Sequence, residues 1–450
     1  MRKADVKSDV WFSLMVTLGF LLGSFAISLE LYRLVPTVHG WVYSGDLFAT
    51  LRDSHMILWG GYGILYSSGN GLIAPPLGAL SLAPLAELGS ILGLVEPYPQ
   101  PFPEPTIWLY ALGYMGIFSF AWTFSAKRLL RSVAPGARRA KFVVACSSVV
   151  AAYMMFPWGH PEDIAAVSLC FFAFSAFHRK SFHVGAYLAG FAVGFQPLAL
   201  LFLEPMFFIF LPTVKRLAAA AVRAAVVPIA LLAPAFIAAP SQSINAWLHQ
   251  PNFPKVDHLT IWGYAFGQGG KILDAGQLRI AMLLAIVLAS IAFRAVHRRR
   301  PLRSQQILLI CALGLSMRAF LEPVIVAYYL APFLAAVVLL VPRDDQKPQL
   351  VAPALTLFGL GIIGTASIHT SPFTYSVDIW SLNLALVLFM VFAYAYAGGE
   401  GATKILRPIG EQEATDDTVE ASALEGFRHA IGTEAVQDKP GALAVNEVPR

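Results

Sequence analysis

The stretch VWFSLMVTLGFLLGSFAISLELYRL, residues 10–34, decides the class of fold. It exceeds the roughly 20 apolar residues that a helix needs to cross the hydrocarbon core of a bilayer. No small-residue cleavage site follows it, so we interpret it as a retained signal anchor. Further apolar runs follow along the 450-residue chain, in which 57% of the residues are hydrophobic and 13% are charged. The composition excludes a soluble globule and predicts an all-α, polytopic membrane protein.

Loop charge predicts the orientation of the spans. The amino terminus, MRKADVK, is basic, and Lys and Arg collect in cytoplasmic loops of membrane proteins. Further basic segments lie between apolar runs, at residues 127–141, 178–180, 215–217, 297–303 and 343–347. Placing them all in the cytoplasm predicts about twelve transmembrane helices in a cell membrane, with both termini cytoplasmic. Besides residues 10–34, the predicted spans are residues 106–126, 142–157, 163–177, 183–197, 198–214, 217–238, 277–296, 305–321, 324–341, 350–368 and 379–397.

Two segments depart from simple crossing. Counting residues 75–95, PPLGALSLAPLAELGSILGLV, as a full span would place the arginines of residues 127–141 outside. We therefore predict a re-entrant or interfacial segment with irregular backbone, consistent with its prolines and Glu87. The spans 183–197 and 198–214 are short and meet at Gln196–Pro197, a break of the kind that often lines a cavity.

Residues 398–450 differ in composition from the rest of the chain. They are acidic and poor in aromatic residues, so they cannot bury enough apolar surface to offset the entropy of ordering. We predict a membrane domain over residues 1–397 and a disordered cytoplasmic tail over residues 398–450.

The predicted outer loop after the first span contains Asp46, Arg52, Asp53 and His55. Apolar side chains in residues 47–58 are spaced as in an amphipathic interfacial helix, which Asp46 would precede. Asp46 is then either an N-cap, whose carboxylate accepts from the following amides, or a functional group. Both interpretations stay open on sequence chemistry alone.

A second group of ionisable residues lies at the predicted outer turn WGHPED. His160, Glu162 and Asp163 lie between two spans, where charged groups are costly and tend to be functional. The alternative is helix capping, because Pro161 suits the first turn and the two acids complement the helix dipole. A divalent metal is conceivable here, but no second spaced His supports it, and we expect no cofactor.

Arg318 and Glu322 stand four residues apart, so on one helix they are expected to face each other. They would then form an ion pair within the membrane. Alternatively, Arg318 binds a phosphate, for which the fork of donors on a guanidinium group is suited.

The order of several short motifs resembles a known family. The resemblance covers roughly residues 10–214 and, more loosely, RAFLEPVIVAYYLAP at residues 318–332. The motifs are GDL (45–47), GGYGILY (60–66), APPLGALSLAPLAEL (74–88), GHPED (159–163) and GFQPLALLFLEP (194–205). In this order they resemble the GT-C superfamily of integral membrane glycosyltransferases, and are most similar to actinobacterial polyprenyl-phosphate-mannose-dependent mannosyltransferases.

The resemblance implies a mechanism centred on Asp46. In such enzymes, an acid in the first outer loop is the general base for an acceptor hydroxyl, and the donor is a polyprenyl-phosphate sugar. Inverting transfer needs one carboxylate to remove the acceptor proton, because the phosphate leaves already charged. A lipid donor also suits a site at the membrane surface.

The resemblance also implies binding residues, with one departure. Relatives often carry Lys where this chain has Gln196, so a cation such as Arg318 or His258 would have to contact the donor phosphate. Tyr66, with the Pro75–Pro76 turn, would shape the pocket. The other residues predicted to bind donor or acceptor are Arg52, His55, His160 and Glu162.

We expect extracytoplasmic transfer of mannose or arabinose from polyprenyl phosphate to a lipid or glycan acceptor. The chain has no nucleotide-binding GxGxxG or P-loop in a convincing context, so the donor would carry its own activation. One alternative is a transporter or lipid flippase of envelope precursors, which typically has broken helices in matching halves. The other is a non-catalytic scaffold, in which Asp46 only caps a helix.

Overall fold

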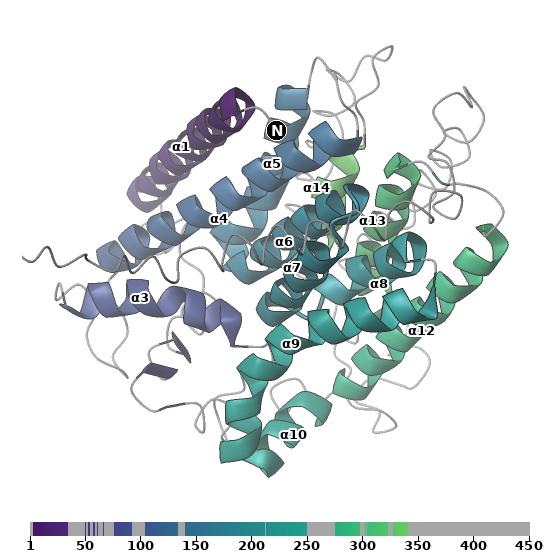
Figure 1. The fold of residues 1–450 in the computed structure, drawn as a ribbon. Helices are drawn as coiled ribbons and strands as arrows, with labels where there is room; N and C mark the ends of the chain where they lie inside the picture. Colours follow the sequence, from purple (N-terminus) through teal and green to yellow (C-terminus); the bar gives the residue numbers. More distant parts are fainter. Residues whose placement is uncertain are drawn as a thin grey trace, which may run out of the picture. The chain divides into compact units, whose positions relative to one another are not determined.

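The computed structural model describes residues 3–34, 76–91, 104–133, 140–211, 213–249, 275–297, 304–322 and 327–340, with the isolated positions 50, 53, 54, 57, 58, 61, 66 and 302. Within these residues, the regular secondary structure is helical throughout (Figure 1). Some described helices contain stretches long and apolar enough to cross a membrane, at Asp5–Ala26, Val214–Ala238 and Gln277–Ala295. The prediction of an all-α fold with membrane-type helices is confirmed at this level. The predicted spans 350–368 and 379–397 and the tail lie outside the described residues.

Helix α1 (Lys3–Leu34) buries several polar residues and exposes large apolar ones. Its buried side carries polar residues, because Asp9, Ser13 and Thr17 are 0%, 0% and 7% exposed. Its outer side exposes large apolar residues, namely Trp11, Leu14, Met15, Leu18, Leu22, Phe25 and Leu29. An apolar outer face of this extent is unfavourable in water and favourable in hydrocarbon. The helix is therefore suited to lipid on its outer side.

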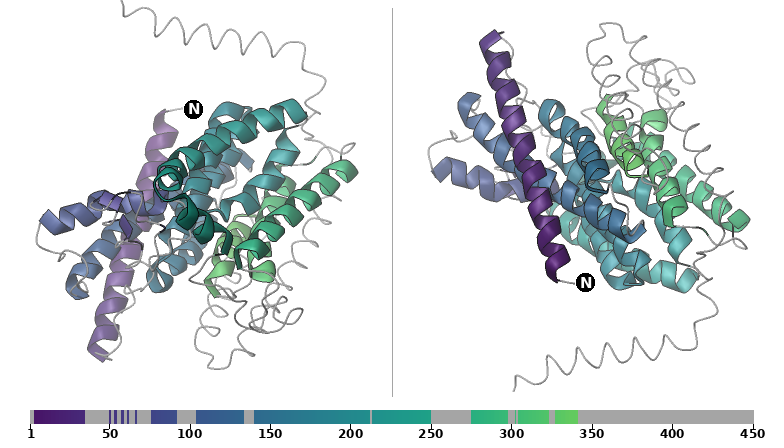
Figure 2. Two further views of the ribbon diagram at one scale, coloured as in Figure 1. Left: turned by 90° about the horizontal axis from the view of Figure 1, so that it is seen from below. Right: turned by 90° about the horizontal axis from the view of Figure 1, so that it is seen from above.

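Helix α6 packs mainly against α4 and α7, and less extensively against α5, α8 and α14, and most of its residues are buried. Figure 2 shows the helices from two further sides. Phe171 of α6 packs edge-to-face on Trp122 of α4 and on Phe202 of α8, with ring centroids 5.0 and 6.0 Å apart. Aromatic packing therefore joins three helices at the core. The bounds are α3 (Leu77–Ile91), α4 (Glu104–Val133), α5 (Ala140–Trp158), α6 (Pro161–His178), α7 (Phe182–Phe195), α8 (Ala199–Phe210), α9 (Val214–Ala238), α10 (Pro240–His249), α12 (Ala275–His297), α13 (Ser304–Leu321), the 3-10 helix η2 (Ala327–Leu330) and α14 (Ala331–Val338).

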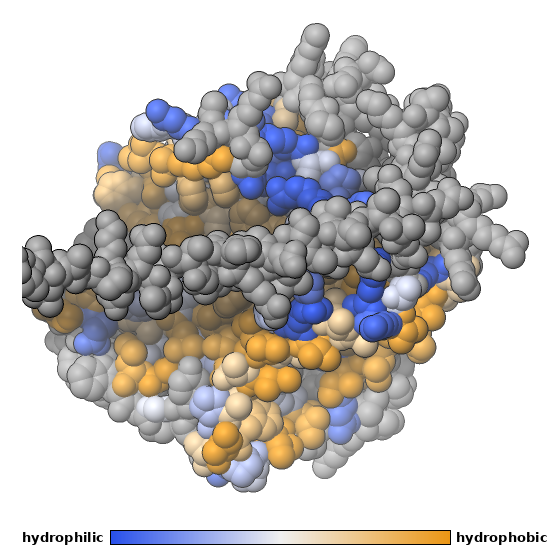
Figure 3. All heavy atoms as spheres, in the orientation of Figure 1, coloured by the Kyte–Doolittle hydropathy of each residue, from blue (hydrophilic) through white to orange (hydrophobic). Residues whose placement is uncertain are grey.

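Helices α9 and α12 also turn apolar side chains outward. Figure 3 shows extensive apolar surface over these helices. The exposed residues include Val222, Val226 and Ile229 on α9, and Leu284 and Leu288 on α12. Among the described residues, the two other apolar stretches of membrane-spanning length thus expose apolar side chains as α1 does.

Glycines allow two pairs of helices to approach closely. A Cβ on Gly314 of α13 would lie 1.9 Å from the carbonyl oxygen of Leu201 in α8, and one on Gly190 of α7 would lie 2.3 Å from that of Ala224 in α9. Pro205 in α8 has no N–H to donate to the Leu201 carbonyl four residues earlier. That carbonyl therefore lacks its usual hydrogen bond within the helix at the point where Gly314 approaches it. Small residues at such contacts are typical of helices packed within membranes.

The predicted break at Gln196–Pro197 is confirmed, because α7 ends at Phe195 and α8 begins at Ala199. Gln196 is extended, with φ −157° and ψ 128°, and its carbonyl accepts from the Ala199 amide at 3.1 Å. The two helices have 14 and 12 residues. At 1.5 Å per residue they are about 21 and 18 Å long, shorter than the ~30 Å hydrocarbon core of a bilayer.

Residues 77–91, within the segment predicted to be re-entrant, form the continuous 15-residue helix α3. The prediction of irregular backbone is wrong here. The helix passes through Pro84, whose ring lies on the exposed side, where a proline bends a helix without ending it. In the preceding loop, the described positions of residues 47–58 are helical, and Ser54 Oγ donates to the Thr50 carbonyl at 2.7 Å.

Two polar contacts join the ends of helices that carry basic residues. Nη2 of Arg131, near the end of α4, donates to Oδ1 of Asp9, near the start of α1, at 2.7 Å. His178 Nδ1, at the end of α6, lies 3.1 Å from Ser304 Oγ, at the start of α13. Helices α1 and α4 therefore run antiparallel, with the start of one beside the end of the other.

Candidate functional site

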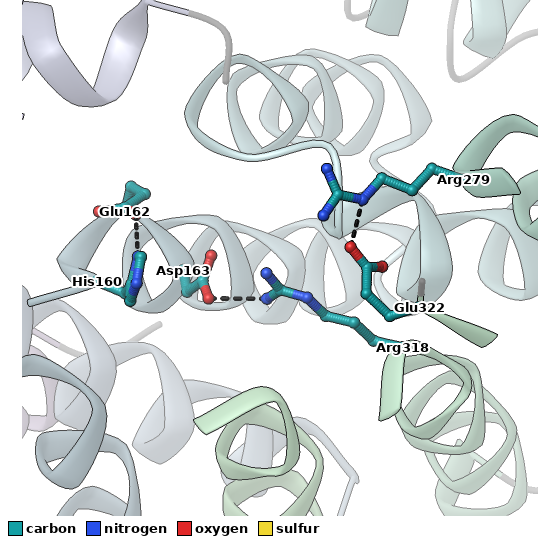
Figure 4. A network of polar contacts seen from close by, with 6 residues as sticks. All are labelled: His160, Glu162, Asp163, Arg279, Arg318 and Glu322. Carbon is teal, nitrogen blue, oxygen red and sulfur yellow. Dashed lines mark hydrogen bonds and ion pairs between the residues drawn. The ribbon is translucent and has the colours of Figure 1, made fainter. Parts of the chain in front are cut away.

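Six ionisable side chains gather beside the start of α6 and form what we call the polar network (Figure 4). The turn before α6 places the first of them. Gly159 has φ +67°, which glycine adopts at little cost, and Pro161 occupies the first helical position. The polar network consists of His160, Glu162, Asp163, Arg279, Arg318 and Glu322.

Asp163 and Arg318 form the innermost ion pair of the polar network. Nη1 of Arg318 donates to Oδ2 of Asp163 at 2.9 Å, and the two side chains are 11% and 0% exposed. The guanidinium group of Arg318 also lies 3.8 Å from the ring centroid of Tyr329. Oδ1 of Asp163 is buried without a hydrogen-bond partner among the described residues. A buried pair of this kind is strongly destabilised when one partner is removed, because the other charge stays buried.

Glu322 does not pair with Arg318, so that prediction is wrong. Glu322 lies just beyond the end of α13, where its amide donates to the Arg318 carbonyl at 3.0 Å. Its Oε1 accepts from Nε of Arg279 in α12, and the Glu322 side chain is 3% exposed. Each arginine therefore pairs with an acid from another helix or segment rather than with its sequence neighbour.

His160 and Glu162 form the third contact of the polar network. His160 Nδ1 lies 2.8 Å from Oε1 of Glu162, and their side chains are 16% and 10% exposed. A Cβ on Gly78, in the first turn of α3, would lie 3.2 Å from Cβ of Glu162. Glu162 thus lies beside the first turns of α6 and α3, where helix dipoles stabilise negative charge. His160 is the N-cap residue of α6, but its side chain makes no capping hydrogen bond.

Helix capping alone does not account for these acids. Their place in the first turn of α6 does complement the helix dipole, as the capping interpretation requires. Asp163 and Glu162, however, also have specific partners in Arg318 and His160. Such partners suit charged groups buried in a largely apolar bundle.

Gln196 and Tyr66 occupy different surroundings. The carbonyl of Phe195, next to Gln196, would lie 3.9 Å from a Cβ on Gly78, so the end of α7 and the starts of α3 and α6 converge. Tyr66 is 4% exposed and belongs to an apolar cluster with Ile57, Ala79, Ala235 and Ala246. Its side chain therefore packs among apolar residues. The predicted site residues Asp46, Arg52, His55 and His258 lie outside the described residues.

Sequence reasoning missed Arg279 as a member of the site. Its signal was one charged residue three positions from the start of an apolar run, residues 277–296. The role of Asp163 as partner of Arg318 could not be read from sequence, because the two residues are 155 positions apart. Within the described residues, no three His, Cys, Asp or Glu side chains are placed to hold a metal ion.

The chain matches no family model and no curated protein. The chemistry of the site therefore follows from its own groups. Two arginines can present guanidinium donors to a phosphate, and buried carboxylates can accept from hydroxyl groups. Because both arginines already bond to carboxylates, an incoming anion has to join or exchange with an existing ion pair.

Proposed function

We propose that the chain is a membrane-embedded glycosyltransferase that moves a sugar, mannose or arabinose, from a polyprenyl-phosphate donor to a lipid or glycan acceptor outside the cytoplasm. The observation that carries the proposal is the polar network, which holds two arginines and three carboxylates in a bundle that is otherwise largely apolar. Charged groups in such a position are costly, so their presence there favours a role in binding or catalysis. The GT-C resemblance gives the reaction class.

Contacts between helix ends that carry basic residues support the proposed orientation. Besides the contacts of Arg131 and His178, Arg294 near the end of α12 donates to the Leu211 carbonyl after α8 at 2.8 Å. In the proposed topology, all these ends are cytoplasmic. The polar network lies at the opposite ends of α6, α12 and α13, and is therefore proposed to be extracytoplasmic. The antiparallel pairing of α1 and α4 favours an α3 that does not cross the membrane.

Arg318 is the proposed contact of the donor phosphate. Its guanidinium group is positioned by the ring of Tyr329 and by the carboxylate of Asp163. An arginine held in this way loses little further freedom when a phosphate binds. The general base proposed by resemblance remains Asp46, which would accept the proton of the acceptor hydroxyl while the sugar–phosphate bond breaks.

The alternative function is transport or flipping of an envelope lipid. The broken pair α7 and α8 favours it, because interrupted helices often line transport pathways. A transporter moves its lipid unchanged, whereas a transferase makes a new product. Detection of a new glycosylated product therefore distinguishes the two functions.

The test is transfer of radiolabelled sugar from polyprenyl phosphate into membrane lipids, with and without the purified protein. Asp46→Asn should abolish most transfer without loss of expression, because Asn caps a helix about as well as Asp but cannot act as the base. Arg318→Lys keeps the charge beside Asp163 but removes the fork, so the donor KM should rise about tenfold or more while the acceptor KM holds. Arg33→Lys, on an exposed residue of α1, is the matched control. Label that crosses the bilayer without forming a product would favour the transporter.

A further inference from the structure

A second charged site lies at the opposite end of the bundle from the polar network. The last two turns of α4, the start of α5 and the residue after α6 each contribute cations there. We call this group the basic cluster. It consists of Lys127, Arg128, Arg131, Lys141 and Arg179.

Among the described residues, the carboxylate of Asp9 lies against the basic cluster. Its Oδ1 accepts from Nη2 of Arg131, while Nη1 of Arg131 is buried without an acceptor among the described residues. Lys127 Nζ lies 5.7 Å from the ring of Phe12, and the Arg128 guanidinium lies 5.6 Å from that of Phe124. Aromatic faces thus position two of the cations.

The positive-inside rule does not explain this arrangement. The rule needs cations on the cytoplasmic side, but it does not need them to be buried or close together. Lys127 is only 8% exposed. Burial lowers its pKa, and Arg131 and Lys141 lower it further, with Asp9 opposing them. For Arg128, burial lowers the pKa first, and the charges of Arg179 and Arg131 add to that effect against Asp9.

Crowded cations of this kind are stabilised when an anion lies among them. We propose that the basic cluster binds the phosphate headgroup of an anionic phospholipid in the cytoplasmic leaflet. Basic pockets between transmembrane helices on the cytoplasmic side are suited to such headgroups, and arginines bind phosphate oxygens through two donors at once. Phe142, next to Lys141, is 42% exposed and is placed to contact an acyl chain.

The test is a thermal unfolding titration of the full-length protein in neutral detergent. Phosphatidylglycerol should raise Tm in proportion to the logarithm of its concentration, and phosphatidylcholine should not. In the double variant Arg128→Gln/Arg179→Gln, the phosphatidylglycerol concentration that gives the same rise in Tm should increase on the order of twenty-fold. Each of the two cations is expected to contribute a factor of about five to the affinity for an anionic lipid. The double variant Lys7→Gln/Lys215→Gln removes two exposed cations that we place on the same side, and it should respond like the wild type.

Other outcomes would overturn the proposal. Equal shifts with the two lipids, or an unchanged response in Arg128→Gln/Arg179→Gln, would exclude a site for an anionic headgroup. Soluble glycerol phosphate that raises Tm as effectively as phosphatidylglycerol would point to a free phosphate rather than a lipid. If the double variant does not fold, Arg179→Gln alone changes an exposed residue, and native mass spectrometry should then detect less co-purified anionic lipid. None of these measurements depends on sugar transfer.

Discussion

Replacing Arg318 by alanine should destabilise the protein more than replacing Arg318 and Asp163 together. The Arg318→Ala variant leaves the carboxylate of Asp163, which is 0% exposed, without its cation. Removing one partner of a buried pair costs about 3–5 kcal/mol, whereas removing both avoids the uncompensated charge. Loss of the contact with Tyr329, at 3.8 Å, adds about 1–2 kcal/mol to both variants.

The free energy of unfolding can be measured for purified variants by titration with a denaturing detergent. Arg33→Ala is the control, because Arg33 and Glu30 are 77% and 60% exposed and lie 3.7 Å apart. An exposed pair of this kind contributes about 0.5 kcal/mol or less. The reasoning is refuted if the double variant Asp163→Ala/Arg318→Ala loses as much stability as the two single variants added together, since the pair would then be uncoupled.

Three further predictions concern other parts of the bundle. Gly314→Ala should lower the free energy of unfolding by about 1–3 kcal/mol, because the added Cβ would lie 1.9 Å from a carbonyl oxygen of α8. Gly113→Ala is the control, because a Cβ at Gly113 would meet nothing within 4 Å and should be tolerated. Burial and, to a smaller extent, the charge of Arg179 lower the pKa of His178 below 6.5, so the unfolded chain binds more protons than the folded protein near that pH. The free energy of unfolding should therefore fall as the pH drops through 6.5. His178→Gln should flatten this pH dependence in unfolding titrations at several pH values. A cysteine at position 132 should react with an impermeant thiol reagent only after cells are permeabilised, and labelling of intact cells would contradict the proposed orientation.

Local patterns predicted much of the helical framework. The span predicted at residues 163–177 is α6, Pro161–His178, because the WGHPED turn carries clear start signals. The break at Gln196–Pro197 could also be predicted from the sequence, since proline is a local signal for the end of a helix. The proline in α3 misled the prediction for the same reason. Pro84 lies on an exposed side of its helix, and exposure is set by packing with other helices.

The site was less readable because its pairs are formed between distant segments. Spacing on one helix predicted that Arg318 would meet Glu322, but the helix ends at Leu321 and the Glu322 side chain turns to α12. The actual partner of Arg318 is separated from it by 155 residues, and no periodicity encodes such a contact. The general-base role of Asp46 stays a prediction, since that residue lies outside the described part of the chain.

The shortness of α7 has a consequence for the surrounding bilayer. Val184, Tyr187 and Phe191 are exposed on this 14-residue helix, so lipid beside it meets an apolar height of only about 21 Å. A bilayer accommodates such hydrophobic mismatch by thinning locally. With the proposed orientation, we expect the outer leaflet to dip toward Gln196, which would let the prenyl chain of the proposed donor stay in hydrocarbon while its headgroup descends toward the start of α6. Sugar transfer in reconstituted vesicles should then be faster in short-chain than in long-chain phosphatidylcholine.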